Sequence, residues 1–218
     1  MARGTGARAP CTDRDALAQP TPTAPRPQKF LKNSSLWGGI LGYLGKHLFI
    51  TRITQYRELY DYERDANDKM LTMLESVPEA SRTDPRFSRA LTIAAHLAAC
   101  RENWLTWMAG EDRPIGWWFE KDVTLESLRP RYAVSEERWV AYLAALTDDD
   151  LEVTFSFKEG DGNTYRVVRS GQLTQLEGHA CYHRGQVVLL VDMHGGTTVD
   201  TDYIDWVYPR DPRYGVVA

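Results

Sequence analysis

Hydrophobic residues recur three or four positions apart in three segments of the chain, covering about residues 51–77, 86–109 and 125–146. Pro78 closes the first segment, Gly110 closes the second, and Pro130 falls near the start of the third. This spacing predicts three amphipathic helices. Their inward positions are Leu59, Tyr62, Ala66, Met70, Met73 and Val77; Phe87, Leu91, Ala94, Ala98, Leu105 and Met108; and Tyr132, Trp139, Tyr142 and Leu146.

A fourth segment has the most regular pattern. Its apolar stripe repeats at alternating intervals of three and four, as in a coiled-coil seam, which predicts a long last helix. Ser170 is the expected N-cap, and Gly195 and Gly196 follow the expected end at His194. The seam positions are Leu173, Leu176, Ala180, His183, Val187, Leu190 and His194.

Residues 151–168 break the helical period. Val153, Phe155 and Phe157 alternate with polar residues, Tyr165 and Val167 do the same, and the run EGDGN at 159–163 separates the two. Alternation around a glycine-rich turn is typical of a β-hairpin. The expected fold is therefore all-α: a four-helix bundle with a short hairpin or irregular connection before the last helix.

The first fifty residues have a different composition from the rest. They contain five of the eleven prolines and seven basic but only two acidic residues. Such a stretch cannot bury enough apolar surface to fold, so residues 1–50 are expected to be a disordered extension and residues 51–218 the helical domain. The apolar run 36–50 is too short for a membrane span and is interrupted by four glycines and Lys46.

Composition narrows the function classes. Lys and Arg total 26 and Asp and Glu total 30, for a net charge of −4, which argues against nucleic acid as a partner. No run is long enough to cross a bilayer, so no membrane partner is expected. The three cysteines lack CxxC spacing and cannot form a disulfide framework, which favours a reducing, cytoplasmic location.

Histidines carry the candidate chemistry. His179 and His183 are four residues apart and project from one helix face, where two imidazoles can share a metal ion. His183 also occupies a seam position, where an unpaired imidazole would cost desolvation energy. His96, in an alanine-rich helix segment, is a candidate third ligand. Three imidazoles would leave open positions on the ion, but core histidines hydrogen-bonded to backbone or Tyr explain the residues equally well.

Other polar residues have weaker assignments. Glu63 and Asn67 flank the first stripe and are candidate catalytic groups that position a water or thiol, or else they lie on a solvated flank. Arg184 is expected at the surface and Gln186 to hydrogen-bond inward. Cys181 points away from the paired histidines, and Cys100 is expected to be a small apolar core residue.

Several runs resemble the DinB family, also called DinB/YfiT-like metalloenzymes. The most specific is HACYHRGQ at 179–186, which is similar to the family's last-helix motif. AHLAACRENW at 95–104 is similar to its second-helix motif and YERDAN at 62–67 to its first-helix motif, although Asp65 and Arg101 depart from the usual residues. The runs RWVAYLAALTDDDL at 138–151 and TDYIDWV at 201–207 complete the resemblance.

The resemblance implies a four-helix bundle, often a homodimer, with nickel or zinc held by His96, His179 and His183. Some relatives are transferases or isomerases that use a low-molecular-weight thiol as cosubstrate. The sequence-based hypothesis is thus a metal-dependent transferase or hydrolase acting on a small-molecule substrate. The alternative is a non-catalytic metal-binding or structural bundle.

Overall fold

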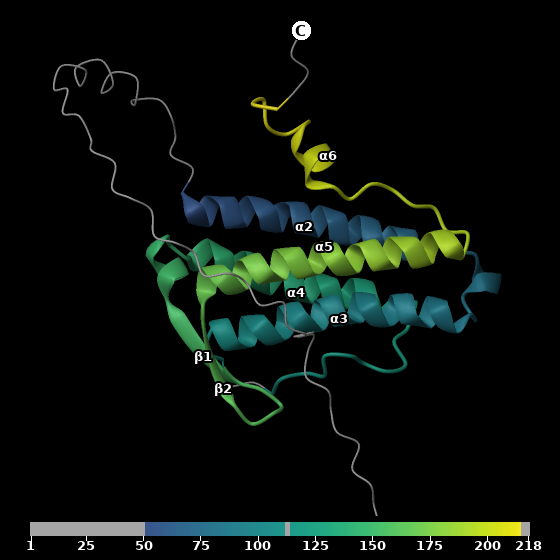
Figure 1. Cartoon of the computed structure of the whole chain (residues 1–218). Helices are drawn as coiled ribbons and strands as arrows, with labels where there is room; N and C mark the ends of the chain where they lie inside the picture. Colours follow the sequence, from purple (N-terminus) through teal and green to yellow (C-terminus); the bar gives the residue numbers. More distant parts are fainter. Residues whose placement is uncertain (1–50, 112–113, 215–218) are drawn as a thin grey trace, which may run out of the picture. The chain divides into compact units, whose positions relative to one another are not determined.

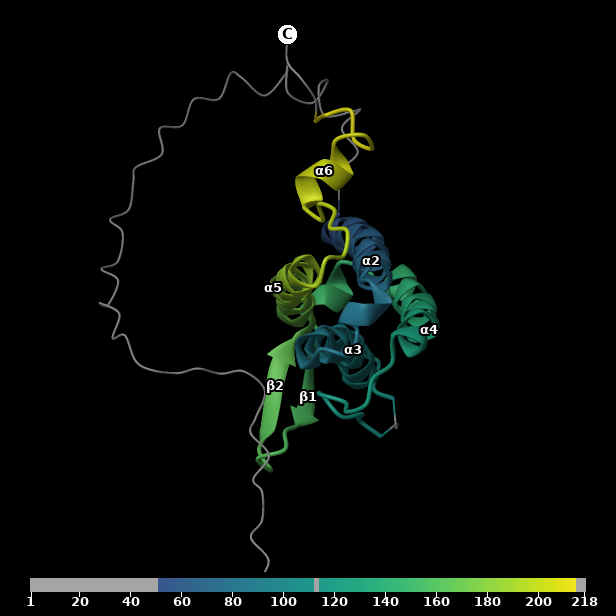
Figure 2. The same cartoon turned by 90° about the vertical axis from the view of Figure 1, so that its right-hand side faces the viewer.

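The computed structural model describes residues 51–111 and 114–214, and the expectations for residues 1–50, His47 included, lie outside them. The described residues form a bundle of four long helices, α2 (Arg52–Glu75), α3 (Pro85–Met108), α4 (Leu125–Ala145) and α5 (Arg169–Met193). Figure 2 shows them around a square in the order α2, α4, α3, α5. The expected all-α bundle is confirmed, and α2 and α3 face each other across its diagonal.

The chain direction changes in an unusual order. Helices α2 and α5 run one way and α3 and α4 the other (Figure 1), so α3 and α4 are parallel neighbours. Parallel neighbours need a long connection, and the part of it at 114–124, called the return loop below, runs along the bundle beside α3. This return places loop residues next to the middle of α3, where His96 lies.

Local sequence sets most helix ends. Thr51 caps α2 by accepting a hydrogen bond from the Thr54 amide, and Asp84 caps α3 through the Arg86 amide. Gly110 and Gly195, just beyond α3 and α5, have φ angles of +66° and +75°, a left-handed conformation that favours glycine.

The expected cap of α5 is wrong, whereas the expected start of α4 is confirmed. Ser170 is not the cap of α5, because the helix begins at Arg169 directly after strand β2 and no side chain caps it. Helix α4 begins at Leu125 and continues through Pro130, which lies beyond its first turn.

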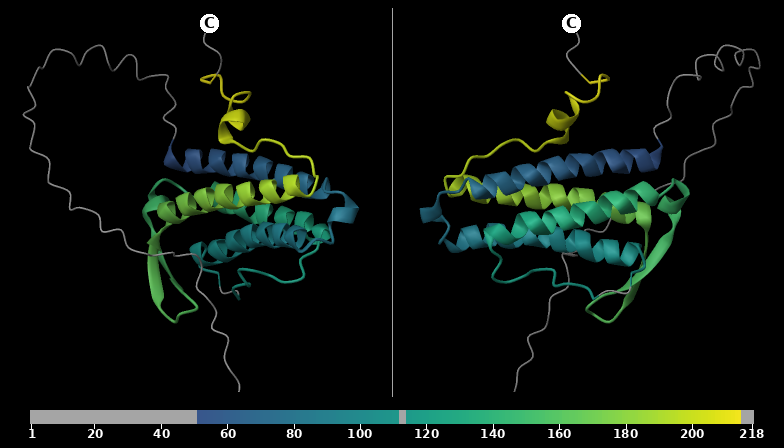
Figure 3. Two further views of the ribbon diagram at one scale, coloured as in Figure 1. Left: turned by 45° about the vertical axis from the view of Figure 1, so that its right-hand side comes forward. Right: turned by 180° about the vertical axis from the view of Figure 1, so that it is seen from behind.

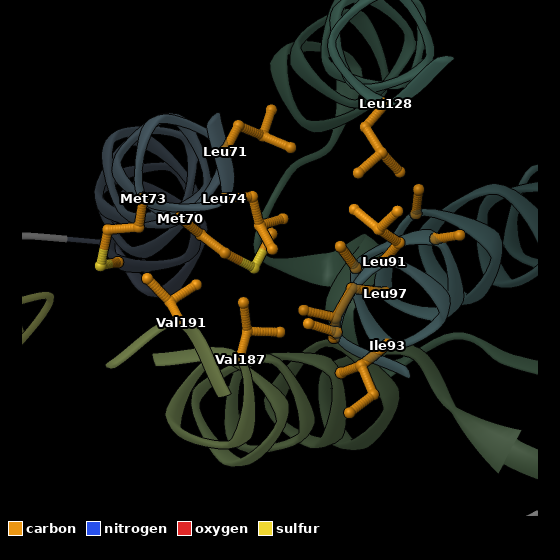
Figure 4. Close-up of a cluster of buried hydrophobic side chains, with 14 of the residues drawn as sticks. Met70, Leu71, Met73, Leu74, Leu91, Ile93, Leu97, Leu128, Val187 and Val191 are labelled. Carbon is orange, nitrogen blue, oxygen red and sulfur yellow. The ribbon is translucent and has the colours of Figure 1, made fainter. Parts of the chain in front are cut away.

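The core fills the centre of the bundle. Figure 4 shows one cluster, in which Met70 and Leu74 of α2 meet Val187 and Val191 of α5, with Leu128 of α4 nearby. The seam predicted for α5 is confirmed: six of its positions are buried and Leu190 is half-buried. One of those buried seam positions is His183.

Smaller elements close the bundle. The predicted hairpin is present as β1 (Thr154–Lys158) paired antiparallel with β2 (Thr164–Val168). Phe157 of β1 packs on Trp104 and Trp107 of α3. Two 3₁₀ turns (Glu79–Ser81 and Asp149–Glu152) precede α3 and the hairpin, and the short α6 (Tyr203–Val207) lies over α2, as both views in Figure 3 show. Among the helices described, none is both long and apolar enough to cross a membrane.

Candidate metal centre

Three histidines from two helices converge inside the bundle. His96 comes from α3 and His179 and His183 from α5, and their ring centroids lie 4.5 to 5.1 Å apart. One ligand nitrogen from each ring lies within 4.8 Å of the other two. His96 and His183 are buried, and His179 is partly exposed at the edge of the cluster.

The local sequence explains this convergence. His179 and His183 are one turn apart on α5, so their side chains project from the same face. On α3, His96 is surrounded by alanines (94, 95, 98 and 99), whose small side chains allow α5 to pack closely. The imidazoles fill the space that larger apolar residues would otherwise occupy.

Hydrogen bonds orient two of the rings. Nδ1 of His96 lies 2.7 Å from the carbonyl oxygen of Trp118, and Nδ1 of His183 lies 2.7 Å from Oε1 of Gln186. Each Nδ1 donates to its oxygen, which leaves Nε2 unprotonated as a metal ligand. The expected inward hydrogen bond of Gln186 is thereby present.

The electrostatic environment keeps the imidazoles neutral. Burial lowers the pKa of His96 to about 4 and that of His179 to about 4, and it also lowers the pKa of His183. Neutral imidazole is the form that binds metal ions, so no proton has to be displaced near pH 7.

The ligand spacing fits one ion. Nε2 of His96 and Nε2 of His179 lie 3.3 Å apart. A tetrahedral ion with metal–nitrogen bonds of ~2.0–2.1 Å requires its ligand nitrogens ~3.3 Å apart, so this pair already has the spacing of two zinc ligands. Three neutral nitrogen donors suit several divalent metals, zinc, nickel, copper and iron among them, and would leave further coordination positions open.

The two candidate catalytic residues face arginines instead of the histidines. Glu63 accepts a hydrogen bond from Nε of Arg101 at 2.7 Å, and Asn67 accepts one from Nη1 of Arg184 at 3.3 Å. Both are buried, so the solvated-flank interpretation is wrong. Within the described residues, neither forms a hydrogen bond with His96, His179 or His183.

The buried role of Arg101 was not predicted from the sequence. Arg101 spans the diagonal of the bundle and pairs with Glu63 of α2 and, at 2.9 Å, with Glu177 of α5. Its guanidinium carbon lies 4.9 Å from the centroid of the Trp139 ring. The available signal was Glu63, which flanks the first stripe four residues after Leu59 and, once buried, needs a cation beside it.

The expectation for Arg184 is wrong, because this residue is 1% exposed. Its guanidinium donates to Asn67, to the hydroxyl of Tyr62 and to the sulfur of Cys181. These contacts place Cys181 toward α2 and away from the histidine cluster, as its helical position predicts.

Cys100 and His194 complete the set of buried candidates. Sγ of Cys100 lies 3.5 Å from Nε2 of His96, and burial raises the pKa of this thiol to about 12. Among the described residues, the group of possible ligand atoms within 4.8 Å of one another contains the three histidines and not Cys100. His194 donates from Nδ1 to the carbonyl of Leu190 and lies at the end of α5, outside the cluster.

Aromatic rings border the centre. Phe119, from the return loop, stacks on His96 with centroids 4.0 Å apart and planes 6° apart, and Tyr182 meets His183 edge-on at 5.0 Å. Asn103 holds the loop beside α3 through two hydrogen bonds to the backbone of Gly116. The loop therefore covers one side of the centre. It supplies an aromatic ring that stacks on His96 and a carbonyl oxygen that accepts a hydrogen bond from His96.

Comparison with known proteins agrees with this geometry. The model of the DinB family matches residues 49–213, which include every described helix and strand and all three histidines. A search of curated proteins finds no match to the chain.

Proposed function

This chain is a member of the DinB family, and from that membership and its three-histidine centre we propose that it is a metal-dependent enzyme. His96, His179 and His183 hold one divalent ion, nickel or zinc. The reaction is a transfer to or from a low-molecular-weight thiol, or a hydrolysis, on a small-molecule substrate. The observation that supports this most is the convergence of three oriented, neutral imidazoles from two helices.

Each group around the centre has a task in this proposal. When bound, the ion lowers the pKa of a thiol or water so that the anion forms near neutral pH. The carbonyl of Trp118 and the amide of Gln186 fix the ring orientations of His96 and His183. Phe119 and Tyr182 border the centre on two sides through their contacts with His96 and His183. Glu63 and Asn67 act at most through Arg101 and Arg184.

The test is a screen of low-molecular-weight thiols with activated electrophiles, using zinc-loaded, nickel-loaded and chelator-treated protein. We expect turnover that depends on metal and is lost in His183→Ala. His194→Gln, which alters a buried histidine outside the cluster, is the matched control and should retain activity. Equal turnover in wild type and His183→Ala would contradict the proposal.

A non-catalytic metal-binding bundle is the second candidate. It is favoured by the engagement of Glu63 and Asn67 with arginines, which leaves no acid or base from α2 at the centre. In that case the ion only fastens α3 to α5. Metal removal would then lower the melting temperature, while no thiol and electrophile pair would react.

The proposal also includes a homodimer, an expectation that comes from the family resemblance alone. Light scattering on the full chain distinguishes one copy from two.

A further inference from the structure

Arg89 is an exposed arginine of α3 that forms no ion pair within residues 51–111 and 114–214. Its neighbours on the same helix are paired: Arg86 with Asp84 and Arg101 with Glu177. An exposed guanidinium without a carboxylate is a ready site for an anion that comes from outside the chain.

The position of Arg89 connects it to the histidine centre. It precedes His96 by two helical turns and so lies on the same side of α3. Its Cζ atom is 6.0 Å from the centroid of Phe119, and that ring stacks directly on His96.

Two exposed aromatic rings border the histidine centre, one of them beside Arg89. Phe119 is 48% exposed although it stacks on His96, and Tyr182 is 62% exposed although it contacts His183. The carboxylate that follows Phe119 in the loop, Glu120, is paired with Arg131 and does not neutralise Arg89. The edge of the centre therefore combines one free positive charge with two exposed aromatic rings.

We propose that the histidine centre accepts a substrate that carries a carboxylate beside an aromatic or other flat apolar group. Arg89 binds the carboxylate, and Phe119 and Tyr182 contact the apolar group next to the metal ligands. This inference rests on the proposed function for the reaction that follows, but the binding itself needs only residues of the chain. Bidentate pairing with guanidinium favours a carboxylate over its neutral amide.

The test measures binding of phenylacetate and of its neutral analogue phenylacetamide to the full chain by calorimetry, with and without zinc. We expect phenylacetate to bind roughly 10-fold more tightly than phenylacetamide in both forms, as one charge-assisted pair provides. Arg89→Ala should abolish this preference and Arg89→Lys should retain part of it. Arg166→Ala, which removes another exposed arginine without an ion pair among the described residues, on β2, should leave the preference unchanged.

Two results would overturn the inference. One is an unchanged preference in Arg89→Ala. The other is loss of phenylacetate binding when zinc is removed, because the metal would then be the only group that recognises the anion. Zinc content measured on the same samples tests the proposed function separately: a preference that depends on Arg89 in protein without a stoichiometric metal site would support this inference and contradict the metal enzyme.

Discussion

The imidazoles of His96 and His179 make the stability of the metal-free protein depend on pH. Burial lowers both pKa values to about 4 from the ordinary value of 6.5. Between these values the unfolded chain binds more protons than the folded chain, so acid favours unfolding. The contribution of these neutral histidines is complete above about pH 6.5 and is lost progressively as the pH falls toward about 4.

Urea unfolding at about pH 7 and about pH 5 in the presence of a chelator checks this expectation. The decrease in unfolding free energy should be smaller in His96→Gln than in wild type, because that variant has one fewer depressed imidazole. Carboxylates contribute equally to both proteins and cancel in the comparison. Identical pH dependence in the two proteins would refute the environment described for His96.

Arg101 is the buried residue whose loss should cost the most stability. Its removal leaves Glu63 and Glu177 buried without their counter-charge, a change that typically costs ~3–5 kcal/mol. Arg101→Met keeps most of the side-chain volume and removes only the charge and hydrogen bonds. We expect a large decrease in the urea midpoint, with no effect in the exposed control Arg166→Met. A decrease in the unfolding free energy of less than about 1 kcal/mol would mean that the network contributes little to stability.

At the scale of elements, the spacing of hydrophobic residues and the prolines and glycines between segments predicted four helices and a hairpin. The prediction of α5 was correct because its heptad pattern of buried residues and the glycines after its end indicate the same helix. The failure occurred at the start of α5. Strand β2 continues directly into α5, so no separate cap at Ser170 is used, and α4 accommodates Pro130 in its second turn because the bundle packs the rest of the helix.

Two glycines of the α5 region should respond oppositely to substitution. A Cβ added at Gly178, within α5, meets no atom within 4 Å, whereas one at Gly196 would lie 2.6 Å from Cγ1 of Val191 and 2.9 Å from Cγ2 of Val77. Gly178→Ala should stabilise the protein by ~0.5–1 kcal/mol, because alanine loses less conformational entropy on folding than glycine does. Gly196→Ala should destabilise it by ~1–3 kcal/mol through overpacking.

Thermal unfolding of the two variants beside wild type measures both effects. The account requires melting temperatures on opposite sides of the wild-type value. A stabilised Gly196→Ala would show that the end of α5 is less tightly packed against α2 than described here.

At the scale of the whole molecule, the histidine site was predictable and its surroundings were not. His179 and His183 share a helix face by arithmetic, and His96 stood out among alanines. The partner of Glu63 lies across the bundle diagonal on α3, and the partner of Asn67 lies on the adjacent helix α5, so no local pattern encodes either contact. The contact of His96 with Trp118 and Phe119 likewise depends on the path of the return loop between α3 and α4.

The family match and the folded bundle cover the same part of the chain. The DinB model covers residues 49–213, and within that range the three histidines come from the two most closely associated helices. A bound ion would therefore join α3 to α5 at mid-bundle, and its loss would be felt by the whole domain.

X-ray absorption spectroscopy of the untagged, zinc-loaded protein counts the imidazoles bound to the ion. We expect one zinc ion per chain with three imidazole nitrogens at ~2.0–2.1 Å and one or two further light ligands. In His183→Ala the imidazole count should fall and the ion should be lost on dialysis. A first shell of sulfur, or one without imidazole, or the same spectrum from His183→Ala, would contradict the assignment of His96, His179 and His183 as a metal centre.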